Sequence, residues 1–279
     1  MSETLERLAA FTTDPTGGNP AGVWIGDNLP SPEEMQKIAA EVGFSETAFV
    51  APSTGSDRNI RYYSPETEVS FCGHATIATG VALGEKGGDG TYQLSTTVGI
   101  VPVSVGTREG HREASLTSVD PSSATAPESL VTGALAALGW QRDELDDAIP
   151  PAKAYAGAWH LVLATADKSC LDDLNYDFEA LKALMIKENI TTLQLVWRER
   201  TDIFHARNPF PVGGVVEDPA TGAAAAALGG YLREAKLIAT PMTFLIRQGE
   251  VMGRPSKIRV EVPVSGGIVV TGNAVRISG

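Results

Sequence analysis

The chain has 279 residues, of which 43% are hydrophobic, so it can bury a full core and is near the size at which one core divides into two. Its 22 Lys and Arg residues against 34 Asp and Glu give a formal net charge of -12, and no run of basic residues interrupts this acidic balance. We therefore expect neither nucleic acid nor anionic membrane surfaces as partners.

No part of the sequence has the pattern of a targeting or membrane-spanning segment. The first residues, Met1–Arg7, are polar and acidic, and no apolar stretch approaches the length of a membrane span. The two cysteines, Cys72 and Cys170, fit a reducing compartment and are too few for a disulfide framework. The four histidines show no metal-ligand spacing. We expect a cytoplasmic protein with no zinc or iron site.

The first clear helix signal is Ser31-Pro32-Glu33-Glu34, which supplies a cap, a proline in the first turn and a capping-box glutamate. Apolar residues at helical spacing follow it, and Gly43 ends the helix. Most of the remaining chain has the pattern of short strands separated by glycine-rich turns. The predicted strands are 91–96, 100–105, 159–164, 192–197 and 257–264, and further helices are predicted at 129–138 and after Asp177.

The segment Phe44–Val50 alternates as a strand does, and it carries a carboxylate on an otherwise apolar face. Phe44, Glu46, Ala48 and Val50 would point the same way along such a strand. A poorly hydrated carboxyl group suits general acid and base chemistry near neutral pH. The alternative is a glutamate at a strand end that reaches solvent.

Two distant stretches, Gly73–Leu83 and Asp218–Leu228, are variants of one pattern, a tight turn that opens a helix of small residues. Each also follows a basic residue and a proline, namely Arg61 with Pro65 and Arg207 with Pro209. A duplicated half-molecule explains both similarities. Because a helix start has unpaired N–H groups and partial positive charge, two starts directed at one cleft would hold an anionic ligand.

Several side chains at these turns could contact such a ligand. His74 lies in the first turn, and Asp218 is interpreted as holding the corresponding place in the second. Capping roles are the alternatives, a histidine bonded to backbone and an aspartate that caps a helix. Cys72 could be a thiolate at a helix start or a small buried residue. The second turn contains no cysteine, so a mechanism with two thiols lacks its partner.

The sequence offers little support for other chemistries. Ser45, His74 and Asp218 could be imagined as a hydrolase triad, but no Gly-x-Ser-x-Gly elbow accompanies them. The glycine-rich loops that bind dinucleotides or nucleotide triphosphates are also missing from the sequence. We therefore expect no dinucleotide or nucleotide triphosphate cofactor.

The best candidate linker is 120–127, which has two prolines and several small polar residues. It separates two segments that each contain one copy of the repeated pattern. We therefore expect a first domain at 1–119 and a second at 128–266.

Five motifs in order along the chain carry a resemblance to a known family. They are Phe11-Thr12 with Gly17–Ala21, Ser45–Val50, Cys72–Thr76, Glu217–Gly222, and Gln248-Gly249 followed by Met252–Ser256. On these motifs the chain resembles the PhzF-like isomerases of phenazine biosynthesis, which share the diaminopimelate epimerase fold. The resemblance runs almost from end to end.

The resemblance implies an α+β fold with two pseudo-symmetric domains, each a curled β-sheet or barrel around a central α-helix. The active site would lie in the cleft between them. It also implies that a C-terminal strand at 267–279 returns to the first domain, and that the protein is a homodimer.

By the same resemblance, Glu46 is the acid and base that moves a proton between two carbons of a small carboxylate-bearing substrate, and no cofactor is needed. His74 and Asp218 match residues that orient this substrate, and the amides after Gly73 and Gly222 match a cradle for its carboxylate. The matching motifs add Asn19, Ser45 and Ala223 as substrate-binding positions and Cys72 and Thr221 as further candidates.

One position departs from the family pattern, because Ala223 follows Thr-Gly in the second turn where serine is common. A hydroxyl that could bond substrate is missing there, so the substrate can differ from the phenazine precursor. The alternatives to a proton-shifting isomerase are a racemase or epimerase that uses Cys72, and a non-catalytic protein that binds small acids.

Overall fold

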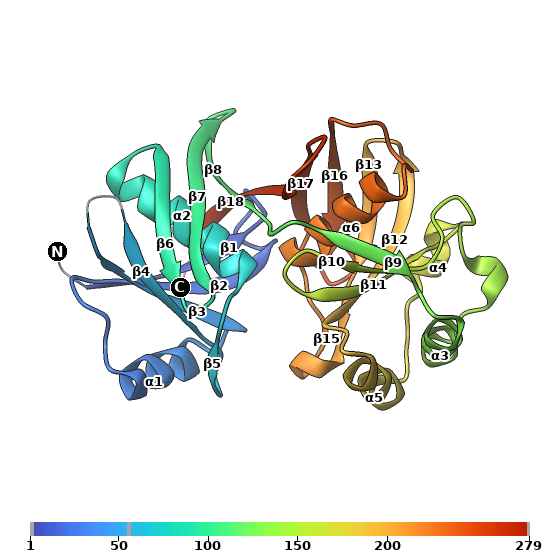
Figure 1. The fold of residues 1–279 in the computed structure, drawn as a ribbon. Coiled ribbons are helices and arrows are strands. Elements are labelled where there is room, and N and C mark those ends of the chain that lie inside the picture. The colour runs from blue at the N-terminus through green and yellow to red at the C-terminus, as the bar shows by residue number, and fades with distance from the viewer. Residues whose placement is uncertain (1–2, 55–56, 278–279) are drawn as a thin grey trace. The chain divides into compact units, whose positions relative to one another are not determined.

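The computed structural model describes residues 3–54 and 57–277, and these residues form two compact units. The first unit contains the described residues up to Thr117 and from Thr271 onward, and the second runs from Ser118 to Val270. Both units combine a sheet with helices (Figure 1). None of the helices in the described part of the chain is long and apolar enough to span a membrane.

The first unit is built from strands and two helices. They are β1 (Thr4–Ala10), β2 (Asn19–Ile25), α1 (Pro32–Val42), β3 (Glu46–Pro52), β4 (Arg58–Tyr63), β5 (Glu68–Val69), α2 (Gly73–Gly87), β6 (Gly90–Thr96), β7 (Gly99–Arg108), β8 (His111–Thr117) and β18 (Val269–Arg276). The strand order β1-β2-β3-β4-β6-β7-β8-β18 closes on itself, because β18 also pairs with β1. This unit is therefore a closed barrel.

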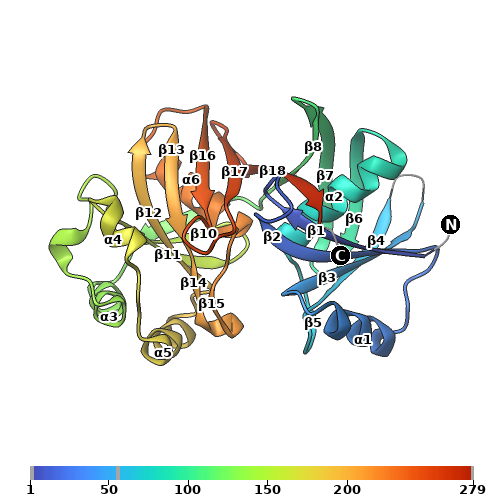
Figure 2. The same ribbon diagram turned by 180° about the vertical axis from the view of Figure 1, so that it is seen from behind.

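Helix α2 occupies the interior of this barrel, and all of its residues from His74 to Gly84 are buried (Figures 1 and 2). Small residues allow the helix to lie close to the strands. A Cβ atom at Gly80 would lie 2.7 Å from the Cβ of Ala114 and 2.8 Å from a methyl carbon of Val103. The interior therefore fixes where α2 begins.

The second unit repeats this plan with additional helices. Its elements are β9 (Ser122–Thr125), α3 (Glu128–Leu138), η1 (Arg142–Glu144), β10 (Ala152–Tyr155), β11 (Trp159–Ala164), α4 (Lys168–Asp172), α5 (Phe178–Glu188), β12 (Thr192–Arg200), β13 (Ile203–Arg207), β14 (Pro209–Phe210), η2 (Pro211–Gly213), β15 (Val215–Glu217), α6 (Gly222–Glu234), β16 (Met242–Gln248) and β17 (Ser256–Val262).

The strand order in the sheet of the second unit is β17-β16-β13-β12-β11-β10-β9. This sheet curls around α6, so the helix packs against β17 at one edge of the sheet and against β9 at the other. The pairing pattern matches that of the first unit. A parallel pair, β2–β3 or β11–β12, has helix between its strands, and another parallel pair, β4–β6 or β13–β16, precedes a hairpin. The expected α+β class, with a curled sheet around a central helix in each half, is confirmed.

The sequence predicts the bounds of α1 correctly, because neighbouring residues determine where this helix begins and ends. Ser31 caps α1 with a complete capping box, and Gly43 ends it in the left-handed conformation with φ 71°. The strand predicted at Phe44–Val50 instead begins at Glu46, because the chain first has to leave this left-handed cap.

The segment 120–127, expected to be a linker, differs from that expectation. It contains β9, which pairs with β10 from Thr125 opposite Ala152 to Ser122 opposite Tyr155. Pro121 and Pro127 lie just outside this strand, where a missing N–H group does not interrupt its ladder. The prolines mark the ends of a short strand, and β9 belongs to the second unit.

A bidentate ion pair precedes each central helix. The guanidinium of Arg61 on β4 contacts the Glu68 carboxylate on β5, with Nη2 and Oε2 2.6 Å apart. Arg207 on β13 contacts Glu217 on β15 in the same way, with distances of 3.0 Å for Nε to Oε1 and 2.6 Å for Nη2 to Oε2. Each glutamate lies five positions before the glycine that opens the helix, 68 before 73 and 217 before 222.

We predict that these two ion pairs differ in their contribution to stability. The side chains of Arg207 and Glu217 are 12% and 4% exposed, against 35% and 31% for Arg61 and Glu68. Arg207→Met leaves a buried carboxylate uncompensated and should lower the free energy of unfolding by about 3–5 kcal/mol. Arg61→Met should cost about 1 kcal/mol because water screens its pair. Urea unfolding of both variants measures the difference, and equal losses would contradict the prediction.

Candidate active site

Glu46 is the first residue of β3 and lies opposite Ala21 of the parallel strand β2. Its side chain is 19% exposed, and Ala48, two residues on and on the same face, is fully buried. Phe49, on the opposite face, packs with Met35 and Ala39 of α1. Glu46 therefore lies on the face that is turned away from α1, where the barrel holds α2.

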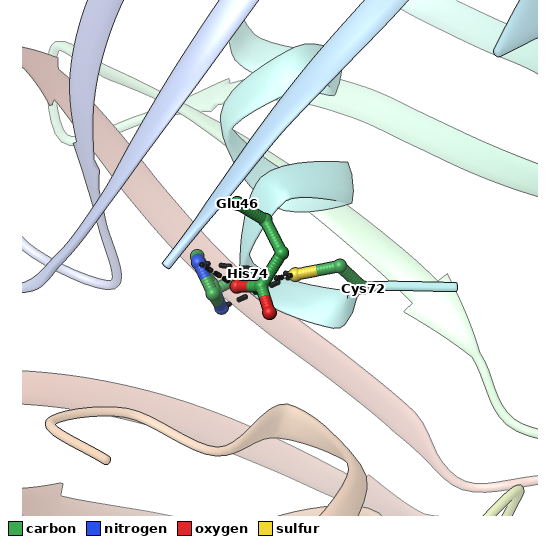
Figure 3. Close-up of side chains that lie close together, drawn as sticks. All are labelled: Glu46, Cys72 and His74. Atoms are coloured by element: carbon green, nitrogen blue, oxygen red, sulfur yellow. Dashed lines mark hydrogen bonds and ion pairs between the residues drawn. The ribbon is translucent and has the colours of Figure 1, made fainter. Parts of the chain in front are cut away.

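Three chemically different side chains converge at the start of α2 (Figure 3). Glu46 Oε2 lies 3.4 Å from His74 Nε2 and 3.5 Å from Cys72 Sγ. Cys72 Sγ lies 3.4 Å from His74 Nδ1 and 3.8 Å from Nε2. Cys72 and His74 are buried, at 8% and 7% exposure. The structure therefore brings Glu46, His74 and Cys72 together, although 26 positions separate the glutamate from the cysteine.

The backbone at Cys72 is held by a buried hydroxyl pair. The Thr76 hydroxyl donates to the Cys72 carbonyl at 2.6 Å and lies 2.7 Å from the hydroxyl of Tyr62 on β4. Burial raises the pKa of Tyr62, so this phenol stays neutral and keeps its hydrogen bond. Tyr62 and Thr76 are thus positioning residues for the helix start.

The helix start itself has the properties of an anion site. Cys72 is the N-cap residue, but its side chain makes no capping bond and points to Glu46 and His74 instead. No acidic residue lies in the first turn. The first amides of a helix have no acceptor within it and carry partial positive charge. A Cβ atom at Gly73 would meet nothing within 4 Å, so a ligand can approach the backbone there.

Two more of the expected substrate-binding residues belong to the first unit. The hydroxyl of Ser45, which is exposed, lies 3.4 Å from His74 Nε2. Asn19 begins β2 and is 2% exposed. It lies two residues before Ala21, the partner of Glu46, and so shares its face of the sheet.

In the second unit, the loop before α6 is connected by side-chain hydrogen bonds. The Thr221 hydroxyl donates to Asp218 Oδ2 at 2.6 Å. Gln248, at the end of β16, accepts from the Thr221 amide at 3.2 Å and donates to the Asp218 carbonyl at 2.7 Å. Asp218 and Ala223 are half-buried and Gly222 is buried. The loop therefore has a fixed shape.

Gln248 and Gly249 were part of a sequence motif but had no role assigned to them. Gly249 has φ 74°, and a Cβ atom there would lie 2.8 Å from the Pro219 carbonyl oxygen and 2.3 Å from that of Arg254. Only glycine fits this close approach. The motif Gln248-Gly249 was the available signal, but the sequence did not show that these residues contact the loop at 218–221.

The correspondence between the two turns differs from the one inferred from sequence. Cys72 is the N-cap residue of α2 and Thr221 that of α6, and Gly73 and Gly222 open the two helices. In this register the counterpart of His74 is Ala223, and not Asp218 as expected. Gly229 supports this register, because Gly229 approaches Val260 of β17 as Gly80 approaches Val103 of β7. The hydroxyl of Thr221 thus stands where a second thiol would be.

The second unit also lacks a counterpart of Glu46. Thr192 begins β12 opposite His160 of β11, as Glu46 begins β3 opposite Ala21 of β2. The Thr192 hydroxyl lies 2.8 Å from His160 Nδ1, and both residues are buried. At this strand position, next to the start of the central helix, the first unit therefore has a carboxylate and the second unit has a hydroxyl.

Comparison with known proteins identifies the family. A family model described as "Phenazine biosynthesis-like protein" matches residues 8–279. The chain belongs to this family. It is 32% identical over 281 residues to an uncharacterised isomerase of Bacillus subtilis, covering 96% of this chain and 94% of the relative. It is 31% identical over 276 residues to trans-2,3-dihydro-3-hydroxyanthranilate isomerase of Pseudomonas aeruginosa, covering 98% and 94%.

A solved structure agrees with this assignment. The crystal structure of a PhzF-family phenazine biosynthesis protein from Bacillus anthracis has a TM-score of 0.87 and 26% identity to this chain, and it covers 100% of this chain and 98% of its own. The resemblance drawn from the five motifs is therefore confirmed. The protein is an isomerase of the PhzF family with the diaminopimelate epimerase-like fold.

We predict that His160 makes this PhzF-family isomerase sensitive to acid. Burial lowers the pKa of His160 from 6.5 to about 4. Between these pH values His160 binds more protons in the unfolded chain than in the folded one. The free energy of unfolding therefore falls as pH decreases from 6.5 to 4, and His160 does not change it above pH 6.5. His160→Gln should weaken this dependence, measured as urea midpoints at several pH values. His111→Gln, at an exposed histidine, is the control. If His160→Gln loses as much stability in acid as the wild type does, His160 is not the cause of the acid sensitivity.

Proposed function

We propose that the protein is a cofactor-independent isomerase that shifts a proton between two carbons of a small carboxylate-bearing substrate, with Glu46 as both base and acid. The observation that carries the proposal is the largely buried Glu46 carboxylate, 3.4 Å from His74 at the start of α2. A base and an anion-binding helix start are thereby combined in one unit. Proton abstraction next to a carboxylate requires both of them.

The proposed reaction follows from this geometry. The substrate carboxylate accepts hydrogen bonds from the first amides of α2, which leaves the adjacent carbon within reach of Glu46. Glu46 removes a proton from that carbon, and the negative charge that develops is stabilised by the fixed amide dipoles. Glu46, now protonated, returns the proton at a second carbon of the conjugated system. His74, 3.4 Å from Glu46, orients the substrate beside this carboxylate.

A single base is favoured over two. A racemase needs one group on each face of the substrate carbon, whereas the second unit has Thr192 in place of Glu46 and Thr221 in place of Cys72. A single carboxylate that removes a proton and returns it elsewhere fits this asymmetry. We include in the proposal that Asp218 and the amides that follow Gly222 also bind substrate, on the strength of the family motif.

The substrate is proposed as a class. The Pseudomonas aeruginosa relative is named for a dihydro-hydroxyanthranilate, a small cyclic carboxylic acid. Ala223 offers no hydroxyl at the second position of α6. A search for the substrate should therefore start from that compound and extend to other small unsaturated or amino-substituted acids.

We predict that Glu46→Gln abolishes proton exchange without unfolding the protein. Positioned acid or base groups contribute about 10²–10⁴-fold to rate, and a loss of that size is expected. NMR in deuterated buffer would follow deuterium incorporation into the relative's substrate and a panel of small acids. Glu66→Gln, at an exposed glutamate of the same unit, is the matched control. Exchange at the wild-type rate in Glu46→Gln would show that Glu46 does not move the proton and would overturn the proposal.

We predict that Cys72→Ser distinguishes the isomerase from a racemase that uses Cys72. If Glu46 alone moves the proton, replacing the thiol by a hydroxyl of similar size should lower the exchange rate by no more than about tenfold, since no acid or base is removed. A thiol that acted as the base would show a loss as large as that of Glu46→Gln. The same deuterium exchange assay measures both, with Cys170→Ser as the control at the second cysteine.

A further inference from the structure

The cluster at the start of α2 contains three kinds of metal ligand. Glu46, Cys72 and His74 offer a carboxylate oxygen, a sulfur and a ring nitrogen, and these atoms all lie within 4.8 Å of one another. Their side chains point toward a common centre (Figure 3). The histidine spacing along the chain gave no such signal, because the three ligands come from two segments that the barrel brings together.

The separations in the cluster are close to the edges of a metal coordination tetrahedron. Zinc binds sulfur at about 2.3 Å and nitrogen or oxygen at about 2.0–2.2 Å, so tetrahedral ligand atoms lie about 3.3–3.6 Å apart. Two separations lie in this range, 3.4 Å from His74 Nε2 to Glu46 Oε2 and 3.5 Å from Cys72 Sγ to Glu46 Oε2. Cys72 Sγ lies 3.4 Å from His74 Nδ1 and 3.8 Å from Nε2, so the edge to Nε2 would have to shorten slightly on binding. A charge-assisted hydrogen bond between imidazole and carboxylate would be shorter, at about 2.7–2.9 Å.

We propose that Glu46, Cys72 and His74 form a Zn²⁺-binding site and that the bound ion inhibits the isomerase. The inhibitory part rests on the proposed function, because it requires Glu46 to be the group that moves the proton. The three side chains would fill three positions of a tetrahedron and leave the fourth to water or to a substrate carboxylate. Bound to the ion through one oxygen, the Glu46 carboxylate is a weaker base and is held toward the ion, so it no longer acts on the substrate carbon.

The ligand set selects zinc over the common hard cations. Sulfur and imidazole favour Zn²⁺, whereas Mg²⁺ and Ca²⁺ require more oxygen ligands than the single carboxylate here. Binding would replace the proton on the Cys72 thiol, which passes to solvent, while Glu46 binds as the carboxylate and His74 as the neutral imidazole. The carboxylate and the thiolate together balance the charge of the ion. Affinity should therefore fall in acid.

The local structure holds two of the ligands in place for this role. Cys72 and His74 flank the first residue of α2, and the Thr76 hydroxyl fixes the Cys72 carbonyl at 2.6 Å.

The second cysteine of the chain, Cys170, is not suited to bind a metal. Burial and the nearby Glu144 carboxylate raise the pKa of Cys170 to about 12, so its thiol is a poor metal ligand.

The test uses Co²⁺ as the probe, in the full chain freed of metal with a chelator. We expect a thiolate-to-cobalt charge-transfer absorption that saturates at one ion per chain and disappears when Zn²⁺ is added. Cys72→Ser should abolish this absorption, and Glu46→Gln and His74→Gln should weaken Co²⁺ binding at least about tenfold. Cys170→Ser should leave it unchanged. Thermal unfolding of each variant verifies that it is folded, and Zn²⁺ should raise the melting temperature of the wild type but not of Cys72→Ser.

The outcomes separate this proposal from the proposed function. No charge-transfer absorption in the wild type, its survival in Cys72→Ser, or its loss in Cys170→Ser would overturn the metal site, whatever the enzyme does with acids. If the absorption is present and deuterium exchange is also found, one equivalent of Zn²⁺ should stop that exchange, and undiminished exchange would overturn the inhibition. Absorption without exchange of any acid would uphold the metal site while removing the proposed reaction.

Discussion

The close packing of a small-residue helix inside a curled sheet is the constraint from which the active site follows. Gly80 in α2 and Gly229 in α6 bring each helix so near its strands that an added methyl group would contact valines of the facing strand. A helix held this tightly along its length has a fixed start. Fixed amide dipoles and a fixed Cys72 backbone are then available at that start, where Glu46 of β3 meets them.

The two halves place different side chains on the same frame. Both have an arginine–glutamate pair whose glutamate lies five residues before the helix glycine, and both have the same succession of parallel and antiparallel strand pairs. The first half carries Glu46 and Cys72 at positions where the second carries Thr192 and Thr221. The two copies of the scaffold thus share their packing and their ion pairs, while the carboxylate and the thiol at these positions occur in the first copy alone.

Much of this could be predicted from the sequence, because its causes are local or recur in a family. The cap at Ser31, the glycine at 43 and the five motifs each indicate a structure that the chain adopts. The correspondence between the two turns was wrong because Ala223–Ala227 is a run of five alanines, which has no register of its own. The ion pairs and the paired glycines supply that register, and they are visible only in three dimensions. The approach of Glu46 to Cys72 has the same origin, since it depends on how the barrel aligns β3 with α2.

The closure of the first barrel by β18 has a consequence for how the protein is made. Residues 8–10 of β1 pair with residues 274–276 of β18, so this barrel cannot close until the ribosome has made the whole second unit and β18. A nascent chain must keep its amino-terminal strands in an open sheet while 118–270 are translated. The second unit can therefore finish folding before the barrel of the first unit closes.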